Sequence, residues 1–155
     1  MNKSQLKRYM GVIYARCCEI LGDRDLAWDA VQESMLRYTQ VAQREQVENT
    51  LALLYRISGF CCVDLQRKHY RTRALCSKLQ HHLGPPEQKV NAAEGKLVLE
   101  RLVQRFGKED VALLTFRHID QMTYQEIAQI MNQSDRGVQK KIARIEERVR
   151  KYLSR

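Results

Sequence analysis

The stretch that most restricts the fold runs from residue 123 to residue 144 and predicts two helices joined by a short turn. Thr123 and Glu126 have the spacing of a capping box, which satisfies free backbone N–H groups at a helix start. Asn132 lies where the chain must reverse, and asparagine tolerates the left-handed backbone conformation better than most residues. Ser134 is a suitable N-cap for the second helix. The pattern is that of a helix-turn-helix.

The second of these helices has one apolar side and several polar sides. Its apolar positions recur at helical spacing: Val138, Ile142, Ile145 and Val149. The other faces carry Arg136, Gln139, Lys140 and Arg144. A helix buried on one side, with Arg, Gln and Lys on the others, suits the major groove of DNA. The alternative is a solvated basic helix in an ordinary helical bundle, but the short turn, the two caps and the positive charge favour DNA.

Positive charge is concentrated in two parts of the chain. Lys and Arg total 27 against 18 Asp and Glu, a net charge of +9. Residues 136–155 hold eight Lys or Arg and two acidic residues, and residues 64–78 hold five and one. Two separate clusters predict two contacts with a polyanion, and an anionic membrane surface is the competing partner. No apolar run approaches the ~20 residues that span a bilayer, and the start does not resemble a signal peptide, so we expect a cytoplasmic protein.

The five cysteines do not indicate a disulfide framework or a metal site. Their number is odd and no C-x-x-C spacing occurs. Two of them fit the apolar side of a predicted helix, so we expect small buried thiols, with a zinc site between two helices as the alternative. The cysteines are Cys17, Cys18, Cys61, Cys62 and Cys76. We expect no cofactor and no metal, and nothing indicates catalysis, since no Gly-rich phosphate loop follows a strand.

Helical periodicity continues through the N-terminal half. It predicts a helix over residues 1–21, a second from an N-cap at Asp25 to about residue 43, and a third over residues 48–70. No segment has the alternation and turn signals of a strand. The expected class is therefore all-α.

The segment from residue 76 to residue 95 differs in composition. It holds both prolines and little periodicity, and Gly84-Pro85-Pro86 cannot lie inside a helix. We expect a flexible linker in which His81 and His82 are solvated, with a long loop inside one domain as the alternative. The prediction is two small helical domains, residues 1–75 and 96–155.

Three stretches resemble one family, the bacterial sigma-70 transcription initiation factors in their smallest, extracytoplasmic-function form. Residues 27–33, AWDAVQE, are similar to the AEDxxQE stretch of the second helix in that family. Residues 54–57 and 64–68, LYRI and DLQRK, resemble its LYRIAxNxxxDxxRR helix, and residues 123–128, TYQEIA, resemble the SYxEIA start of its helix-turn-helix. The order, the spacing and the proline-containing linker also fit.

The chain also departs from the family pattern at several positions. Trp28 stands where an acidic residue is usual, and Gly59-Phe60 stands where Arg-Asn is common. Leu53 lies near the usual Trp before the LYRI stretch, and Phe106-Gly107 replaces the common Leu-Pro.

The resemblance implies a sigma factor, which is not an enzyme and which gives core RNA polymerase its promoter specificity. Residues 1–75 would form the region 2 domain and residues 96–155 the region 4 domain. On the second helix, the residues that would dock on the β′ clamp helices are Asp29, Gln32 and Glu33. A solvated helix face is the alternative for these three. The β flap of the polymerase and an anti-sigma factor are further partners of the kind that the resemblance suggests.

The resemblance also implies two contacts with promoter DNA. The third helix would meet the −10 element as the strands separate, through Tyr55, Arg56, Phe60, Arg67, Lys68 and Arg71. Bases there can be held by stacking, although Tyr55 and Phe60 could equally be core residues. The helix-turn-helix would read the −35 element as duplex, through Arg136, Gln139, Lys140, Lys141, Arg144 and Arg148.

Two other functional classes remain open from the sequence. A stand-alone dimeric helix-turn-helix regulator would bind an inverted repeat without core polymerase. An interaction protein would use the basic faces to bind acidic partners or RNA. Association with core polymerase distinguishes the first class, and sequence-selective duplex binding excludes the second.

Overall fold

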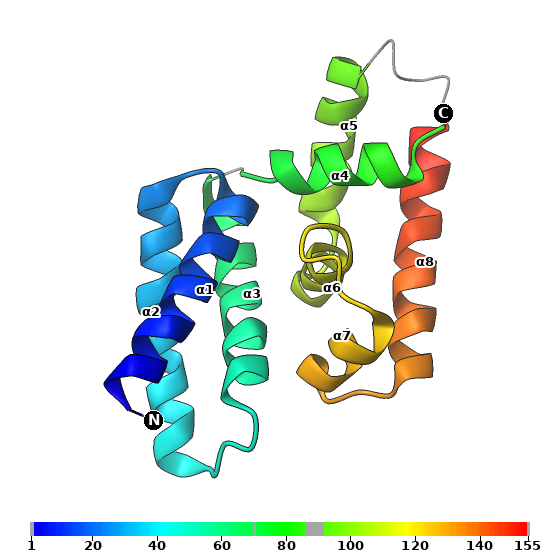
Figure 1. Cartoon of the computed structure of the whole chain (residues 1–155). Helices are drawn as coiled ribbons and strands as arrows, with labels where there is room; N and C mark the ends of the chain where they lie inside the picture. Colours follow the sequence, from blue (N-terminus) through cyan, green and yellow to red (C-terminus); the bar gives the residue numbers. More distant parts are fainter. Residues whose placement is uncertain (1, 70, 86–91, 155) are drawn as a thin grey trace.

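The computed structural model describes residues 2–69, 71–85 and 92–154, and for residues 92–98 the backbone alone. This part of the chain forms eight helices and no strand, so the predicted all-α class is confirmed. The helices form two groups that lie side by side (Figure 1). Among the described helices, none is both long and apolar enough to cross a membrane.

The N-terminal group consists of α1 (Lys3–Leu21), α2 (Arg24–Arg44) and α3 (Thr50–His69). Gly22 ends α1 with a left-handed conformation, φ 65°, which glycine adopts without steric cost. The predicted N-cap of α2 at Asp25 is wrong. Asp23 has the extended conformation of a cap, and its Oδ1 accepts from the backbone N–H groups of Asp25 and Leu26 at 2.9 and 3.0 Å.

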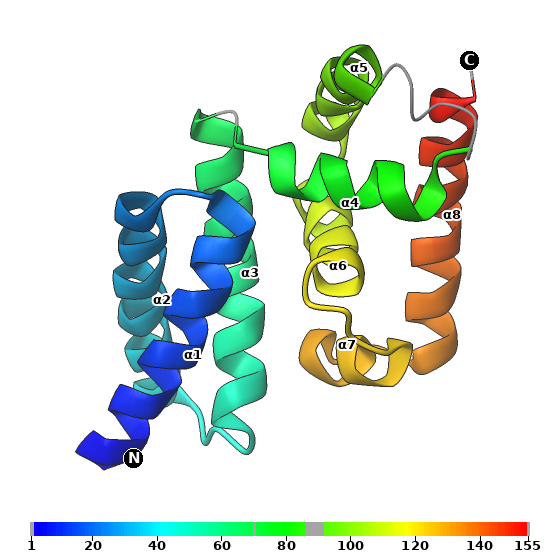
Figure 2. The same cartoon turned by 45° about the horizontal axis from the view of Figure 1, so that its top comes forward.

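The C-terminal group begins with α4 (Arg73–Leu83) and α5 (Ala92–Arg105). The helices α6 (Lys108–His118), α7 (Tyr124–Met131) and α8 (Asp135–Leu153) follow. Figure 2 shows α4 lying across this group, where it packs against α5, α6 and α8. The predicted helix-turn-helix corresponds to α7 and α8.

The expectation of an extended linker does not hold for residues 76–83, which belong to α4. Leu75, Cys76 and Leu79 have one helical side in common and are fully buried against the C-terminal group. The stripe was missed because it begins before the predicted boundary, and because Gly84 and Pro85 end the helix without preventing it. The remaining linker prediction falls partly on residues 86–91, which lie outside the described residues.

Two smaller predictions concern histidines and cysteines. His82 is exposed but not merely solvated, because its Nδ1 lies 2.8 Å from Nδ1 of His118. Four of the five cysteines are buried, as expected for small core thiols, and Cys18 is half-buried. Among the described residues, no three His, Cys, Asp or Glu side chains are grouped so that they could hold a metal ion.

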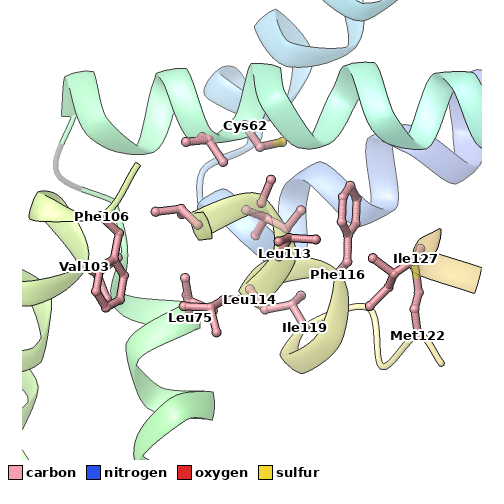
Figure 3. Packing of buried hydrophobic residues seen from close by; sticks show 14 of the residues in the cluster. Cys62, Leu75, Val103, Phe106, Leu113, Leu114, Phe116, Ile119, Met122 and Ile127 are labelled. Carbon is pink, nitrogen blue, oxygen red and sulfur yellow. The ribbon is translucent and has the colours of Figure 1, made fainter. Parts of the chain in front are cut away.

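The two groups share one hydrophobic core, in which α3 packs against α6 and α7. Figure 3 shows Cys62 of α3 facing Leu113 of α6, with the ring of Phe116 directed toward the same helix. All three side chains are fully buried. The first group is therefore in direct contact with the helices that support the helix-turn-helix.

Candidate nucleic-acid interface

Local hydrogen bonds cap both helices of the helix-turn-helix at the predicted N-caps, although only the bond to the Thr123 side chain of the predicted capping box is formed. Thr123 Oγ1 accepts from the N–H of Glu126, and Ser134 Oγ accepts from the N–H of Gly137, both at 3.1 Å. Asn132 adopts the left-handed conformation with φ 53°, and its N–H donates to Ala128 O. These bonds satisfy backbone groups that helix ends leave free, so they set the angle at which α8 leaves the turn.

The two sides of α8 are divided as the periodicity predicted. The buried apolar side consists of Val138, Ile142, Ile145, Val149 and Leu153. The exposed side carries Arg136, Gln139, Lys140, Arg144 and Arg148. The guanidinium of Arg148 lies 4.8 Å from the ring centroid of Phe106, which supports its side chain at the surface. A basic and amide-bearing surface therefore runs along α8 from its first turn.

Lys141 is the predicted DNA contact that the structure places differently. It is half-buried, and its Nζ lies 3.3 Å from Glu109 Oε1 and 3.0 Å from Gln133 Oε1. The Gln133 amide donates to the same Glu109 oxygen at 3.0 Å. Gln133 first and then Lys141 lower the pKa of Glu109 against the opposing effect of burial. The charge of Lys141 thus joins α8 to α6 and to the turn.

A buried pair that sequence analysis missed holds α8 against α6. Glu146 is 9% exposed, and its Oε1 lies 3.0 Å from Nε2 of His118, which is also buried. Burial raises the pKa of Glu146, but His118 and Arg150 lower it, and the net pKa lies below its usual value. The signal was an acidic residue on the apolar side of α8, between Ile145 and Val149.

Residues 97–155 match the family described as sigma-70, region 4. This part of the chain is therefore similar to region 4 of the sigma-70 family. The match covers the helix-turn-helix and α6 in full, and most of α5. No curated protein matches the sequence. Sigma-70 region 4 is a DNA-binding regulatory domain, not a catalytic one, and the exposed side of α8 lies within the matched residues.

Outside region 4, the six residues predicted for the −10 element fall into two sets. Arg56, Lys68 and Arg71 are exposed on or just after α3. The other three are half-buried and meet groups outside α3. The Arg67 guanidinium donates to Phe106 O, the Phe60 ring lies 5.4 Å from Lys108 Nζ, and the Tyr55 ring lies 4.9 Å from the guanidinium carbon of Arg16. Two of these contacts are made with the C-terminal group.

The three predicted polymerase contacts are exposed together on α2. Asp29, Gln32 and Glu33 lie on its outer face, and Glu33 Oε1 accepts from Arg37 Nε at 2.8 Å. Two large apolar side chains that the sequence analysis did not assign to this face accompany them: Trp28 is 45% exposed and Leu36 is 56% exposed. Their spacing of eight residues, with Gln32 midway, places them along one line of the helix.

Proposed function

We propose that the protein is a sigma factor of the extracytoplasmic-function group, which binds core RNA polymerase and directs initiation at specific promoters. The observation that carries the proposal is the region 4 helix-turn-helix with Arg136, Gln139 and Lys140 exposed near the N-terminal end of α8. That end of such a helix usually enters the major groove. Arginine suits the guanine edge and glutamine the adenine edge, so these residues would read the −35 element as duplex. Arg144 and Arg148 lie further along and would hold phosphates.

The N-terminal group supplies the remaining contacts in this proposal. The outer face of α2 with Asp29, Gln32 and Glu33 would dock on the β′ clamp helices. The face of α3 would hold the separated −10 strand, with Tyr55 and Phe60 as stacking platforms and the basic residues of α3 on the phosphates. These assignments rest on the resemblance of residues 27–33, 54–57 and 64–68, and on the exposure of the α2 residues. Such a protein acts on promoter DNA in the cytoplasm.

Run-off transcription with core polymerase on a library of genomic promoter fragments tests the proposal. Transcripts that depend on the added protein should begin at promoters sharing one −35 sequence and one −10 sequence. A stand-alone dimeric regulator would instead bind an inverted repeat without core polymerase and would start no transcript. No protein-dependent transcript from any fragment would contradict the proposal.

Duplex binding then separates reading residues from phosphate contacts. Arg136→Ala or Gln139→Ala should reduce the free energy of binding to the selected −35 duplex by ~1–3 kcal/mol and should change binding to a scrambled duplex little. Arg148→Ala should weaken binding to both duplexes about equally and reduce the salt dependence of binding. Arg44→Ala is the matched control, because Arg44 is an exposed arginine at the end of α2. Equal losses on both duplexes for the Arg136 and Gln139 variants would show that α8 does not read sequence.

A further inference from the structure

We propose that Cys17 and Cys62 form a peroxide-reactive dithiol, which closes reversibly to a disulfide between α1 and α3. In this proposal Cys17 supplies the attacking thiolate, and Cys62 converts the oxidised product to the disulfide. The site lies within the N-terminal group and does not depend on the proposed function, so the two proposals can fail separately.

The two sulfur atoms are already in contact where α1 packs against α3. The S–H of Cys62 donates to Cys17 Sγ, and the sulfur atoms are 3.4 Å apart. The two residues are 45 positions apart in the sequence, and both side chains are fully buried. A disulfide joins sulfur atoms about 2.05 Å apart, so the pair has only a short distance left to close.

Arg16, the residue before Cys17, fixes the position of α1 on α3 beside the sulfur pair. Its Nη1 donates to Ser58 Oγ at 2.7 Å, and Ser58 precedes Cys62 by about one helical turn. Its Nε and Nη2 form a bidentate ion pair with the two carboxylate oxygens of Asp120, at 2.7 and 2.8 Å. These bonds hold the guanidinium in one place, so its positive charge acts on the nearby thiols from a fixed position.

The two thiols differ in how readily they ionise. The hydrogen bond from Cys62 and then the charge of Arg16 lower the pKa of Cys17, against the opposing effects of burial and of Asp120. The same hydrogen bond and burial raise the pKa of Cys62 well above its ordinary value. Because the thiolate is the nucleophile in cysteine chemistry, Cys17 should react first.

Hydrogen peroxide is the oxidant that such a pair suits, because it is small and uncharged and the site is buried. The Cys17 thiolate attacks one oxygen and the O–O bond breaks. The sulfur becomes a sulfenic acid, and the leaving oxygen takes up the proton that Cys17 released and departs as water. Cys62 then attacks the sulfenic sulfur, the S–S bond forms, and the hydroxyl group leaves with the Cys62 proton as a second water. The two thiols lose two electrons, and the peroxide gains them.

The disulfide would join the first and third helices of the N-terminal group and enclose all of α2 in a covalent loop. Closing a loop restricts the unfolded chain, so the oxidised protein should resist urea better than the reduced protein. Disulfides in the cytoplasm, where the protein is proposed to act, are typically transient and redox-sensing. A reductant should therefore reverse the change.

Burial slows the reaction, because a thiol without exposed surface meets peroxide only when the helices separate locally. Cys61 provides the comparison that allows for this effect. It is also buried and lies next to Cys62 on α3, but burial raises its pKa. A difference between the rates of Cys17 and Cys61 therefore reports their chemistry in addition to their access.

Oxidation of the reduced full-length protein with hydrogen peroxide tests the pairing. After quenching, the free thiols are alkylated with N-ethylmaleimide, and the digest is analysed by mass spectrometry without reductant. We expect one linked pair of peptides, which joins Cys17 to Cys62 and which dithiothreitol separates. The Cys17 thiol should disappear at least about tenfold faster than the Cys61 thiol. In concentrated urea this difference should vanish, because it depends on the folded contacts.

Three serine variants separate the two roles. Cys62→Ser keeps a hydroxyl that can donate to Cys17, so oxidation should stop at a sulfenic acid that dimedone traps. In Cys17→Ser, Cys62 should react no faster than Cys61. Cys61→Ser is the matched control, because it makes the same change one residue away and should form the linked pair as the wild type does. Circular dichroism shows which variants fold, and the result for the wild type stands without them.

The urea midpoint provides a second measurement. Oxidation should raise it by about 1 M or more in the wild type and in Cys61→Ser, and should leave it unchanged in Cys62→Ser. A wild type in which Cys17 and Cys62 remain free thiols after peroxide treatment would overturn the proposal. Loss of Cys61 as fast as Cys17 would also overturn it, as would a linked pair that forms equally well in concentrated urea.

Discussion

Gly137→Ala provides a test of how the turn before α8 is built. Gly137 is the third residue of α8, and its N–H donates to Ser134 Oγ. A Cβ at this position would lie 2.8 Å from the same hydroxyl oxygen. The hydroxyl can rotate away, but then it no longer caps the helix. The substitution should therefore exchange a capping bond for a better helix former.

The magnitudes predict a near cancellation that a double-mutant cycle can reveal. Alanine in place of glycine favours a helix by up to about 1 kcal/mol, and losing a serine cap costs about 1 kcal/mol. Gly137→Ala alone should thus change the free energy of unfolding by about 0 kcal/mol, whereas Ser134→Ala alone should lower it by about 1 kcal/mol. In the Ser134→Ala background the hydroxyl is gone, so Gly137→Ala should restore about 1 kcal/mol. The expected coupling energy is about 1 kcal/mol.

Urea denaturation of the four full-length proteins, followed by circular dichroism, measures this coupling. The duplex affinity should respond differently from the stability: Gly137→Ala should weaken −35 binding, because the uncapped first turn carries Arg136. Additivity of the two substitutions within about 0.5 kcal/mol would refute the reasoning. It would mean that the hydroxyl and the added methyl group can coexist.

Three further predictions follow from the charged residues. Lys140→Ala should weaken duplex binding in a fluorescence titration without shifting the urea midpoint. Lys141→Ala should leave duplex binding nearly unchanged and lower the free energy of unfolding by at most about 1 kcal/mol, because the Lys141 charge pairs with Glu109 of α6. The opposite result would contradict the assignment of Lys140 to DNA and of Lys141 to the fold. Charge reversal at Asp29 and Glu33 should reduce capture by core polymerase in a pull-down with an unchanged circular dichroism spectrum, and undiminished capture would remove α2 from the docking surface. Although the His82 side chain is exposed, partial desolvation and the neighbouring His118 of α6 lower its pKa from the ordinary 6.5. The unfolded chain therefore binds a proton at His82 more readily than the folded chain does, so the urea midpoint should fall slightly as the pH drops from 6.5 through the lower folded pKa. The fall should be smaller in His82→Gln. An identical pH profile for the two proteins would refute this role of His82.

Local rules were sufficient for the helix-turn-helix. The bonds at Thr123, Ser134 and Asn132 join groups at most four residues apart, so the sequence shows both partners at once. The same holds for the exposed and buried sides of α8, which depend only on the helical period. The error at α2 was local too, because Asp23 and Asp25 are both capable caps and the backbone after Gly22 decided between them.

The helix α4 was at the limit of what periodicity can predict. Its buried stripe is short, and it is stabilised by packing against α5, α6 and α8. A short helix is marginal in water without such packing. Gly84 and Pro85 directly follow α4, and such residues are typical of a linker whether or not a helix precedes them.

By itself, the sequence determined the helical class, the helix-turn-helix and the basic exposed side of α8, because hydrogen bonds and side-chain periods within a few residues govern them. Tertiary structure alone decided which charged side chains form buried pairs. Arg16 and Asp120 are 104 residues apart, and His118 and Glu146 are 28 apart. A buried charge requires a partner, but any of many residues could supply it, and only the packing of the two groups selects one. The same packing places Phe60 and Arg67 against the C-terminal group, although their types alone favour contact with a single strand.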